Sequence, residues 1–411
     1  MNQLEKNERI KNSTLATRER HSAMLCKVFE MKIDKSHISK TQSDFLHRLF
    51  SEAKWLYNHQ LSNDNIFNIS DKIKEVSVLN KDKVLETREL ANLSAQMKQE
   101  LIERTKQNVV ALNRSKKKGN KVGSLKFKSQ VNSIPLKQVN QTYRVVNTKT
   151  IKIEKCKKPF RVIGLEQLPK DCDITGAVLI HRLCDYYIMI TCFVDKIPKA
   201  ITNKSIGLDF GIKDNVVTSN RERFNFSFPE SKQIKKASRR FNKSKKGSKN
   251  RYKRRLELSK AYLKLSNKKK DTINKFVSKL IKENDHICIQ DENIHEWQSS
   301  KMKGWGRKIQ YSIMGGIISK LKMSSETIII DKFVPTTQLC PLCGTLHKHN
   351  LDQRTYACLC GYAEDRDIHS AKNILHLGLS KIPTEHRNLI PAEEIVNTSS
   401  GTNETLEVNF F

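Results

Sequence analysis

Acidic residues in three separate parts of this chain are of the type that binds divalent metal ions. Asp209 lies in an apolar, strand-like run between two glycines, which allow another backbone or a ligand to approach it closely. Asp291 and Glu292 end a second strand-like run, and Asp367 stands where a helix begins. Phosphodiester hydrolysis by two Mg²⁺ or Mn²⁺ ions needs converging carboxylates, because these ions prefer oxygen ligands. The three segments therefore predict a metal-dependent nuclease site with one acid from each.

Four cysteines in a short stretch have the spacing of a zinc site. They form two pairs that 14 residues separate, and a glycine follows each pair; the four are Cys340, Cys343, Cys358 and Cys360. Four thiolates fit tetrahedral Zn²⁺, and the glycines permit tight knuckle turns. His347 and His349 lie nearby as substitute ligands, and a disulfide pair or an iron–sulfur cluster are the alternatives. We expect one structural zinc ion that shapes a flap and takes no part in chemistry.

The most basic part of the chain is residues 231–284, with 21 Lys and Arg against three Asp and Glu. Its pattern is helical apart from a break at Gly247. A solvated pair of charged helices is one interpretation, but so uneven a cluster repels itself without counterions, which favours contact with phosphates. The residues expected to bind nucleic acid are Lys235, Lys236, Arg239, Arg240, Lys245, Lys246, Arg251, Lys253, Arg254 and Arg255.

Composition points to the same class of partner. The 411 residues include 76 Lys and Arg against 43 Asp and Glu, a formal net charge of +33, which implies a polyanion. Nucleic acid is favoured over a membrane surface, because no apolar run of about 18 residues and no signal-peptide pattern is found. The six other cysteines are scattered singly, as in a reduced, cytoplasmic protein. We therefore expect a protein of the prokaryotic cytosol, associated with the nucleoid.

Periodicity predicts the elements that must position these groups. Residues 1–20 are polar and aperiodic, so we predict a mobile arm. Apolar residues at helical spacing predict a helical subdomain over 40–118. Short alternating segments over 119–202, with a strand in 21–39, predict a small β-barrel that the helices interrupt. The Pro-, Thr-, Asn- and Glu-rich end, 381–411, is predicted to be a disordered tail.

The second half alternates strands with helical patterns. Three strands are predicted between residues 204 and 228, the first carrying Asp209, and further strands at 286–292 and 327–333. Between these last two, one helix face is predicted from the spacing of Ile309, Ile313, Ile317 and Leu321.

The order of these features resembles the transposon-encoded TnpB proteins and the compact type V CRISPR effectors. The resemblance extends over residues 22–378 and is carried by Gly207–Gly211, the cysteine quartet and Asp365–Ile374. It also includes the glycine-then-Lys-Phe-Lys element in Gly123–Ser129. It implies an α+β multidomain protein whose RNase H-like (RuvC) nuclease core is split in sequence. A β-barrel wedge domain, a helical recognition insertion and a zinc knuckle complete that architecture.

The resemblance also implies domain limits and a function. Parts I and II of the nuclease core would span 203–335 and contain the basic insert 231–284. A zinc-binding target-nucleic-acid module would follow at 336–364. Part III of the nuclease core would span 365–380. The protein would hold a noncoding guide RNA derived from its transposon's end. It would cleave double-stranded target DNA beside a short flanking motif that the protein itself reads.

The middle acid departs from the family's pattern. Family members often carry Glu where this chain has Gln290. Strand side chains alternate, so an extended strand would put Gln290 and Glu292 on one face and Asp291 on the other. We therefore expect Glu292 to be the catalytic ligand with Asp209 and Asp367, and Asp291 to be the second choice.

Other functions remain open from the sequence. If neither acid of the middle segment reaches the metals, a guide-directed DNA-binding repressor without cleavage results. A transposase proper and a Holliday-junction resolvase use similar acids. Taken alone, Asp209 is also explained as a turn residue and Asp367 as an N-cap.

Overall fold

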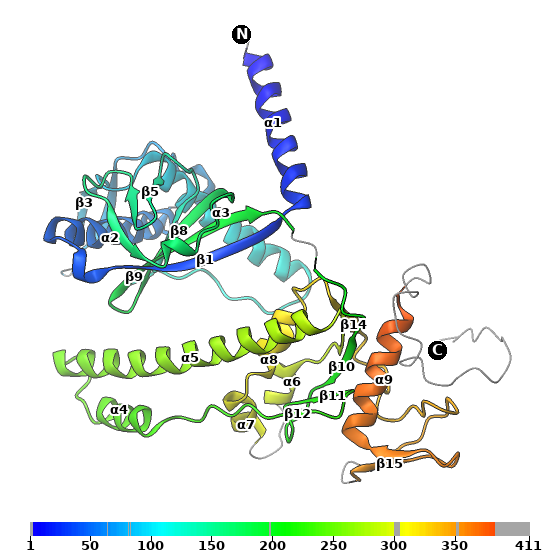
Figure 1. The fold of residues 1–411 in the computed structure, drawn as a ribbon. Coiled ribbons are helices and arrows are strands. Elements are labelled where there is room, and N and C mark those ends of the chain that lie inside the picture. The colour runs from blue at the N-terminus through cyan, green and yellow to red at the C-terminus, as the bar shows by residue number, and fades with distance from the viewer. Residues whose placement is uncertain are drawn as a thin grey trace. The chain divides into compact units, whose positions relative to one another are not determined.

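The computed structural model describes residues 3–63, 65–80, 82, 84–196, 199–299, 305–350 and 353–382. The chain divides into two compact units, Met1–Pro198 and Lys199–Phe411 (Figure 1). The predicted tail, 381–411, lies outside the described residues except for its first two. Within the described part, no helix is both long and apolar enough to cross a bilayer.

The first unit is built on seven antiparallel strands in the order β4-β8-β9-β1-β7-β6-β5. Their bounds are β1 (Leu25–Ile33), β4 (Ser133–Leu136), β5 (Tyr143–Asn147), β6 (Thr150–Ile153), β7 (Phe160–Ile163), β8 (Asp173–Arg182) and β9 (Asp185–Val194). A bridge between Val139 and Tyr143 joins the segment after β4 to the start of β5, so the sheet curls almost into a closed barrel. The predicted barrel is confirmed, including the early strand, since β1 pairs with β7 and β9.

Helices interrupt the barrel where the sequence predicts them. They are α2 (Lys40–Ser62) and α3 (Ala95–Lys117), and serine caps begin both. Between them lies a hairpin that the sequence analysis missed, β2 (Glu75–Leu79) with β3 (Leu85–Glu89). Three short 3₁₀ turns complete the unit: η1 (Lys35–His37), η2 (Ile66–Asn68) and η3 (Leu165–Gln167).

The prediction of an arm at residues 1–20 misses a helix, α1 (Gln3–Ala23). Its side chains are almost all exposed, so it has no apolar face that periodicity could reveal. Contacts at its end hold it to the sheet: Arg20 and His21 both pair with Asp173, and the His21 ring stacks on Phe193 at 3.9 Å.

The second unit contains a five-stranded sheet in the order β12-β11-β10-β13-β14. Its strands are β10 (Ser205–Asp209), β11 (Val216–Thr218), β12 (Arg223–Phe224), β13 (His286–Gln290) and β14 (Thr327–Ile330). β10, β13 and β14 run parallel, while β11 and β12 are antiparallel additions. Parallel strands end at the same edge, so the carboxyl ends of β10 and β13 bring Asp209 and Gln290 to one side of the sheet.

Helices cover both faces of this sheet. Ile206 and Ile289 pack in one apolar cluster with α5 (Lys249–Glu283) and α8 (Met314–Leu321), whereas Cys288 packs with α9 (Arg366–Ser380). The approach of α9 to β10 requires Gly207, because a Cβ there would lie 2.1 Å from the backbone oxygen of Ala371. The expectation that this glycine admits another backbone is confirmed, and Asp209 shares its face, towards α9.

The remaining helices differ in detail from the prediction. The basic segment folds as α4 (Lys232–Asn242) and α5, separated at Gly247 with φ +80° as predicted. The helix predicted across 309–321 is two helices, α7 (Trp305–Tyr311) and α8, which break at Ser312; all four predicted apolar residues are nevertheless buried. A short helix α6 (Ile294–Ser299) and the pair β15 (Thr355–Ala357) and β16 (Ala363–Asp365) complete the unit.

Candidate functional site

Asp209 is the last residue of β10 and lies beneath α9. Ser370 of that helix donates a hydrogen bond of 3.1 Å from its Oγ to Asp209 Oδ1. Burial raises the pKa of Asp209 to about 7; the bond from Ser370 opposes the rise, and the charges of Asp367 and Glu292 add to it. The two other predicted acids therefore lie close enough to Asp209 for their charges to act on it.

Asp367 is the second residue of α9 and does not cap it. The N-cap is Asp365, whose Oδ1 accepts from the backbone nitrogens of Asp367 and Ile368 at 3.1 and 3.2 Å. The alternative explanation of Asp367 as a cap is thus wrong. Its position one turn before Ser370 puts both side chains on one helix face.

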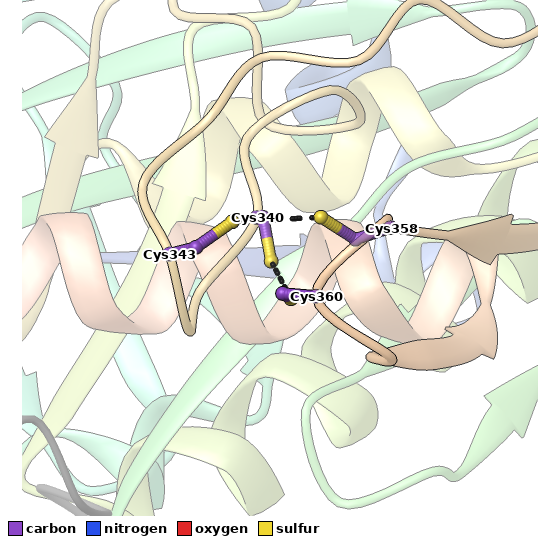
Figure 2. Close-up of side chains that lie close together, drawn as sticks. All are labelled: Cys340, Cys343, Cys358 and Cys360. Atoms are coloured by element: carbon purple, nitrogen blue, oxygen red, sulfur yellow. Dashed lines mark hydrogen bonds between the residues drawn. The ribbon is translucent and has the colours of Figure 1, made fainter.

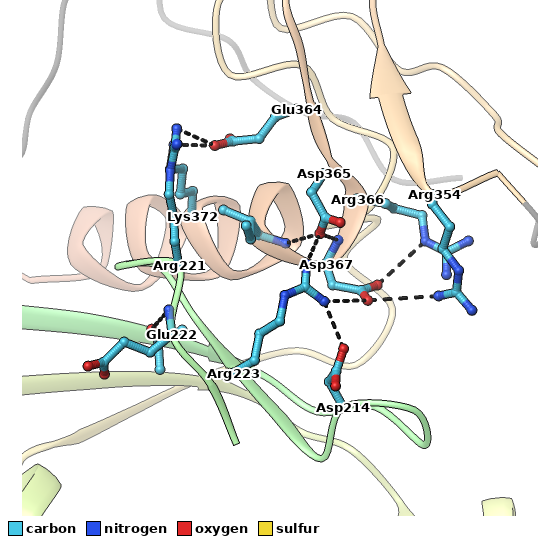
Figure 3. Close-up of polar contacts among 12 residues, drawn as sticks. Asp214, Arg221, Glu222, Arg223, Arg354, Glu364, Asp365, Arg366, Asp367 and Lys372 are labelled. Carbon is cyan, nitrogen blue, oxygen red and sulfur yellow. Dashed lines mark hydrogen bonds and ion pairs between the residues drawn. The ribbon is translucent and has the colours of Figure 1, made fainter. Parts of the chain in front are cut away.

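Arginines surround the Asp367 carboxylate (Figure 3). Nitrogens of Arg223, Arg354 and Arg366 lie 3.9, 3.8 and 3.7 Å from its oxygens. Arg223 makes much shorter ion pairs, both of 2.7 Å, with Asp214 and Asp365. Asp214 and Asp365 are therefore engaged in close ion pairs, while Asp367 keeps longer contacts that a metal ion can replace.

The middle segment does not fold as expected beyond Gln290. β13 ends at this residue, and the backbone nitrogen of Glu292 bonds back to the Gln290 oxygen at 2.8 Å. This tight turn ends the alternation of faces, so the argument that Glu292 replaces Gln290 along one strand face is wrong. Gln290 itself is only 6% exposed.

Of the two remaining acids, Glu292 lies in the more suitable environment. Its charge contributes to the raised pKa of Asp209. Burial and neighbouring Asp291 raise the pKa of Glu292 itself. Asp291 instead forms an ion pair with Lys322, and its side chain is 52% exposed.

The three carboxylates are not gathered around one point. Among the described residues, the four cysteines are the sole set of three or more candidate ligands whose donor atoms all lie within 4.8 Å of one another. Ligands of one Mg²⁺ lie within about 4 Å of one another, but two ions about 4 Å apart connect oxygens as far as about 8 Å apart. Asp209, Glu292 and Asp367 do not form a set as tight as the cysteines, and a two-ion site does not require one.

The cysteine quartet has the geometry of a tetrahedral metal site (Figure 2). The Cys340 and Cys360 sulfurs lie 3.6 Å apart, and those of Cys343 and Cys358 3.5 Å apart. A disulfide needs about 2.05 Å, whereas thiolates on one zinc ion lie about 3.8 Å apart. The following glycines, Gly344 and Gly361, have φ of +72° and +90°, a left-handed backbone that fits the predicted tight knuckle turns.

Neither predicted substitute ligand joins the cysteines. His347 Nε2 lies 3.0 Å from the Thr345 hydroxyl, and the His349 ring packs against Tyr356. Tyr356 also stacks on His369 of α9 at 3.8 Å. The cysteine segment is therefore anchored on the helix that carries Asp367.

The ten basic residues predicted to bind nucleic acid lie on α4, on the start of α5 and between them. Eight of these side chains are exposed, and the other two, Arg251 and Arg254, are half-buried and make contacts within the protein. Arg251 donates to the backbone oxygens of Phe241 and Ser244 at 3.2 and 2.7 Å, so it closes the α4–α5 turn. Arg254 pairs with Glu257 at 2.9 Å.

The sequence analysis missed two residues of the site, Ser370 and Thr336. Ser370 could have been found, since it follows Asp367 by three residues on a predicted helix. Thr336, whose hydroxyl lies 3.1 Å from that of Ser370, follows β14 in a loop with no sequence signal.

Two protein-family models match this unit and the strand before it. Residues 189–299 match the IS605 OrfB family, described as a probable transposase, and residues 317–374 match the Cas12f1-like TNB domain. The resemblance to TnpB proteins and compact type V effectors inferred from the sequence is confirmed by these matches. The two segments include Asp209, Glu292, Asp367 and the cysteine quartet.

Individual proteins are also similar to this chain. A "putative RNA-guided DNA endonuclease" of Streptomyces pristinaespiralis is 26% identical over 239 residues, which span 56% of this chain and 59% of that protein. The cryo-EM structure of the Cas12f1–sgRNA–target DNA complex has a TM-score of 0.50 at 14% identity and covers 86% of this chain and 99% of that one. The CasPhi-2 (Cas12j) structure with crRNA and phosphorothioate DNA has a TM-score of 0.41, 9% identity, and coverage of 86% and 91%. The likeness to Cas12f1 shows a shared mixed α/β fold.

Proposed function

We propose that this chain, which resembles TnpB proteins and Cas12f1, is an RNA-guided DNA endonuclease encoded by an insertion sequence. It would bind a noncoding guide RNA derived from the transposon's end. It would cleave double-stranded DNA next to a short flanking motif. The observation that carries the proposal is the hydrogen bond from Ser370, one turn after Asp367 on α9, to Asp209 at the end of β10; the charges of Asp367 and Glu292 also act on Asp209.

The five-stranded sheet with α9 is proposed to be an RNase H-like (RuvC) core. Asp209, Glu292 and Asp367 would hold two Mg²⁺ or Mn²⁺ ions, whose oxygen preference their carboxylates match. Such ions supply an activated water and stabilise the leaving oxygen. Within the protein, Ser370 fixes the Asp209 carboxylate, and the arginines around Asp367 balance its charge and can contact the phosphate of the cut strand.

The cysteine quartet is proposed to hold one structural Zn²⁺ within a target-nucleic-acid module, 336–364. The sulfur distances and the left-handed glycines support this assignment. The module would present its surface to DNA, since Tyr356 and His369 fix it on α9. The barrel (21–39 and 119–202) and the helical insertion (40–118) would grip guide RNA and flanking duplex.

The exposed basic residues of α4 and α5 are proposed to follow nucleic-acid phosphates. Their charge is largely unbalanced, since only a few acids lie in this segment. Arg251 and Arg254 would contribute less, because their guanidinium groups already have partners.

The test begins with the protein purified from cells that also express the transposon end. RNA that purifies with it is sequenced, and plasmids carrying a matching target are incubated with Mg²⁺. Wild type is compared with Asp209→Ala and with Asp271→Ala, a surface aspartate on α5 that pairs with Lys275. Defined RNA, with cleavage lost only in Asp209→Ala, supports the proposal; purification without RNA contradicts it.

A nuclease-inactive RNA-guided DNA-binding protein is the second candidate. It is favoured by Gln290, which stands at the family's usual acid position and is held by hydrogen bonds to the segment after β14. Defined RNA and guided DNA binding, without cleavage at any Mg²⁺ or Mn²⁺ concentration, would select it. Strand joining would instead identify a transposase proper.

A further inference from the structure

The side chain of Gln290 makes four hydrogen bonds, all to one loop. This loop, residues 331–336, follows β14. The Gln290 amide nitrogen donates to backbone oxygens of Asp331, Lys332 and Val334 at 3.2, 3.2 and 2.9 Å. Its oxygen accepts from the Thr336 hydroxyl at 3.1 Å. The side chains of Gln290 and Thr336 are buried, at 6% and 3% exposed, whereas residues 331–333 of the loop are exposed.

The same bonds continue to the proposed catalytic carboxylate. The hydroxyls of Thr336 and Ser370 lie 3.1 Å apart, and Ser370 donates to Asp209 at 3.1 Å. Because Ser370 gives its proton to Asp209, the single Thr336 proton is shared between Gln290 and Ser370. A buried polar chain of this kind holds its members in one arrangement.

One charged side chain of the loop acts on Glu292. Burial and Asp291 raise the pKa of Glu292, and the ammonium group of Lys332 opposes that rise. Within the loop, the backbone nitrogen of Phe333 bonds to Asp331 Oδ1 at 2.8 Å. Lys332 of this loop thus lies near enough to Glu292 for its charge to act on that carboxylate.

An amide is the group that these surroundings require. Three carbonyl oxygens face the side-chain nitrogen, and an amide offers them two N–H groups. A carboxylate there would have no proton to donate and would be repelled by all three oxygens. Removing the donors would cost the loop these three hydrogen bonds, although the Asp331 and Val334 oxygens also accept from the backbone nitrogens of Val334 and Thr336 at 3.3 and 2.9 Å.

We propose that Gln290 is a positioning residue that fixes loop 331–336 and, through Thr336 and Ser370, orients Asp209 for metal binding. This inference rests on the proposed nuclease function. Relatives often carry an acid at this position. In this chain the residue holds a loop through N–H groups, a structural task that an ionised acid cannot perform. Restoring Glu at this position would therefore damage the site.

The test compares Gln290→Glu and Gln290→Leu with wild type and with Gln310→Glu, the same charge change at an exposed position on α7. Guided plasmid cleavage is followed over a range of Mg²⁺ concentrations. Both Gln290 variants are expected to lose about 10- to 100-fold in maximal rate, the usual loss when a group that orients a ligand is removed. Gln290→Glu is expected to need no less Mg²⁺ than wild type, and Gln310→Glu to behave as wild type.

Hydrogen exchange of residues 331–336 supplies a readout that does not depend on cleavage. Faster exchange there in both Gln290 variants, with unchanged exchange in β10, supports the fixing of the loop by Gln290. If no guide activates the wild type, the proposed function fails, and the orientation of Asp209 for metal binding fails with it, whereas the role of Gln290 in the loop stands. Gln290→Glu that cuts as fast as wild type or faster, or that needs less Mg²⁺, overturns it. Unchanged exchange in loop 331–336 overturns it as well.

Discussion

The hydroxyl of Ser370 donates a hydrogen bond of 3.1 Å to the carboxylate of Asp209, across 161 residues of sequence. It joins the end of a strand to the first turns of the last described helix. Since Asp367 lies one turn before Ser370, the bond helps to fix the relative positions of Asp209 and Asp367, two of the three proposed ligands.

Replacing Ser370 by Ala is expected to reduce guided cleavage by about 10- to 100-fold, because Asp209 loses the group that orients it. Ser319→Ala, a matched change at an exposed serine of α8, is expected to leave the rate unchanged. Single-turnover rates at saturating Mg²⁺ measure both. Equal rates for the two variants would show that the bond has no role in cleavage.

Glu292→Gln is expected to lower the cleavage rate by more than about 100-fold, and Asp291→Asn by less than about 10-fold, if loss of a ligand costs more than loss of its supporting group. The reason is that Glu292 acts on Asp209, whereas Asp291 pairs with Lys322 at the surface. The two variants are compared in one plasmid assay. The reverse order of rates would make Asp291 the middle ligand.

The stability of the Mg²⁺-free protein is expected to fall as pH rises. In the fold the pKa of Asp209 is about 7, above its ordinary value of 3.8, so the folded state binds this proton more tightly than the unfolded chain. The resulting stabilisation is complete below the ordinary value and is lost as pH rises through about 7.

Denaturant unfolding at pH 5 and pH 8, with zinc present and magnesium omitted, measures this effect. Asp209→Asn, which cannot ionise, is expected to show a smaller difference in unfolding free energy between the two pH values. The same difference in both proteins would contradict a raised pKa for Asp209.

The purified protein is expected to contain one zinc ion per chain. Cys343→Ser is expected to reduce zinc content and to lower the melting temperature, because metal binding contributes directly to folding. Cys26→Ser, an exposed cysteine outside the quartet, serves as the control. Plasma mass spectrometry measures the metal. Full zinc content in both variants would rule out the quartet.

RNA affinity is expected to depend steeply on salt through α4 and α5. Replacing Lys245 and Lys246 together by Gln should reduce the slope of log affinity against log salt by about 1.4 to 1.8, at about 0.7 to 0.9 per lost phosphate contact. The control changes Lys275 and Lys279, which have acidic partners on α5. Equal slopes for the two double variants would place the RNA elsewhere.

Sequence reasoning succeeded where one residue type has few structural uses. Gly207 between apolar residues predicted a close approach, and its packing against α9 confirms it. The cysteine spacing likewise predicted a cluster and tight turns at the two following glycines, which have positive φ. In both cases the local sequence alone limits what the backbone can do.

It failed where a contact across the fold decides the outcome. The alternation of side-chain faces past Gln290 assumes that the strand continues. Instead, the Gln290 side chain donates a hydrogen bond to the loop after β14, and the backbone turns at Glu292. Helix α1 has no buried face from which it could be recognised. The distances between the three carboxylates depend on side-chain rotamers and charge, which periodicity does not report.

The wide spacing of the nuclease segments has a consequence for synthesis. Asp209 leaves the ribosome 161 residues before Ser370. At about 5–20 residues per second, translation of that interval takes roughly 8 to 30 seconds. During this time the basic helices α4 and α5 have already emerged, while β10 still lacks the helix that covers it. If α4 and α5 bind RNA as proposed, a nascent chain would take up RNA before its proposed nuclease site is complete. A product that ends before Asp367 would then bind nucleic acid without cleaving it.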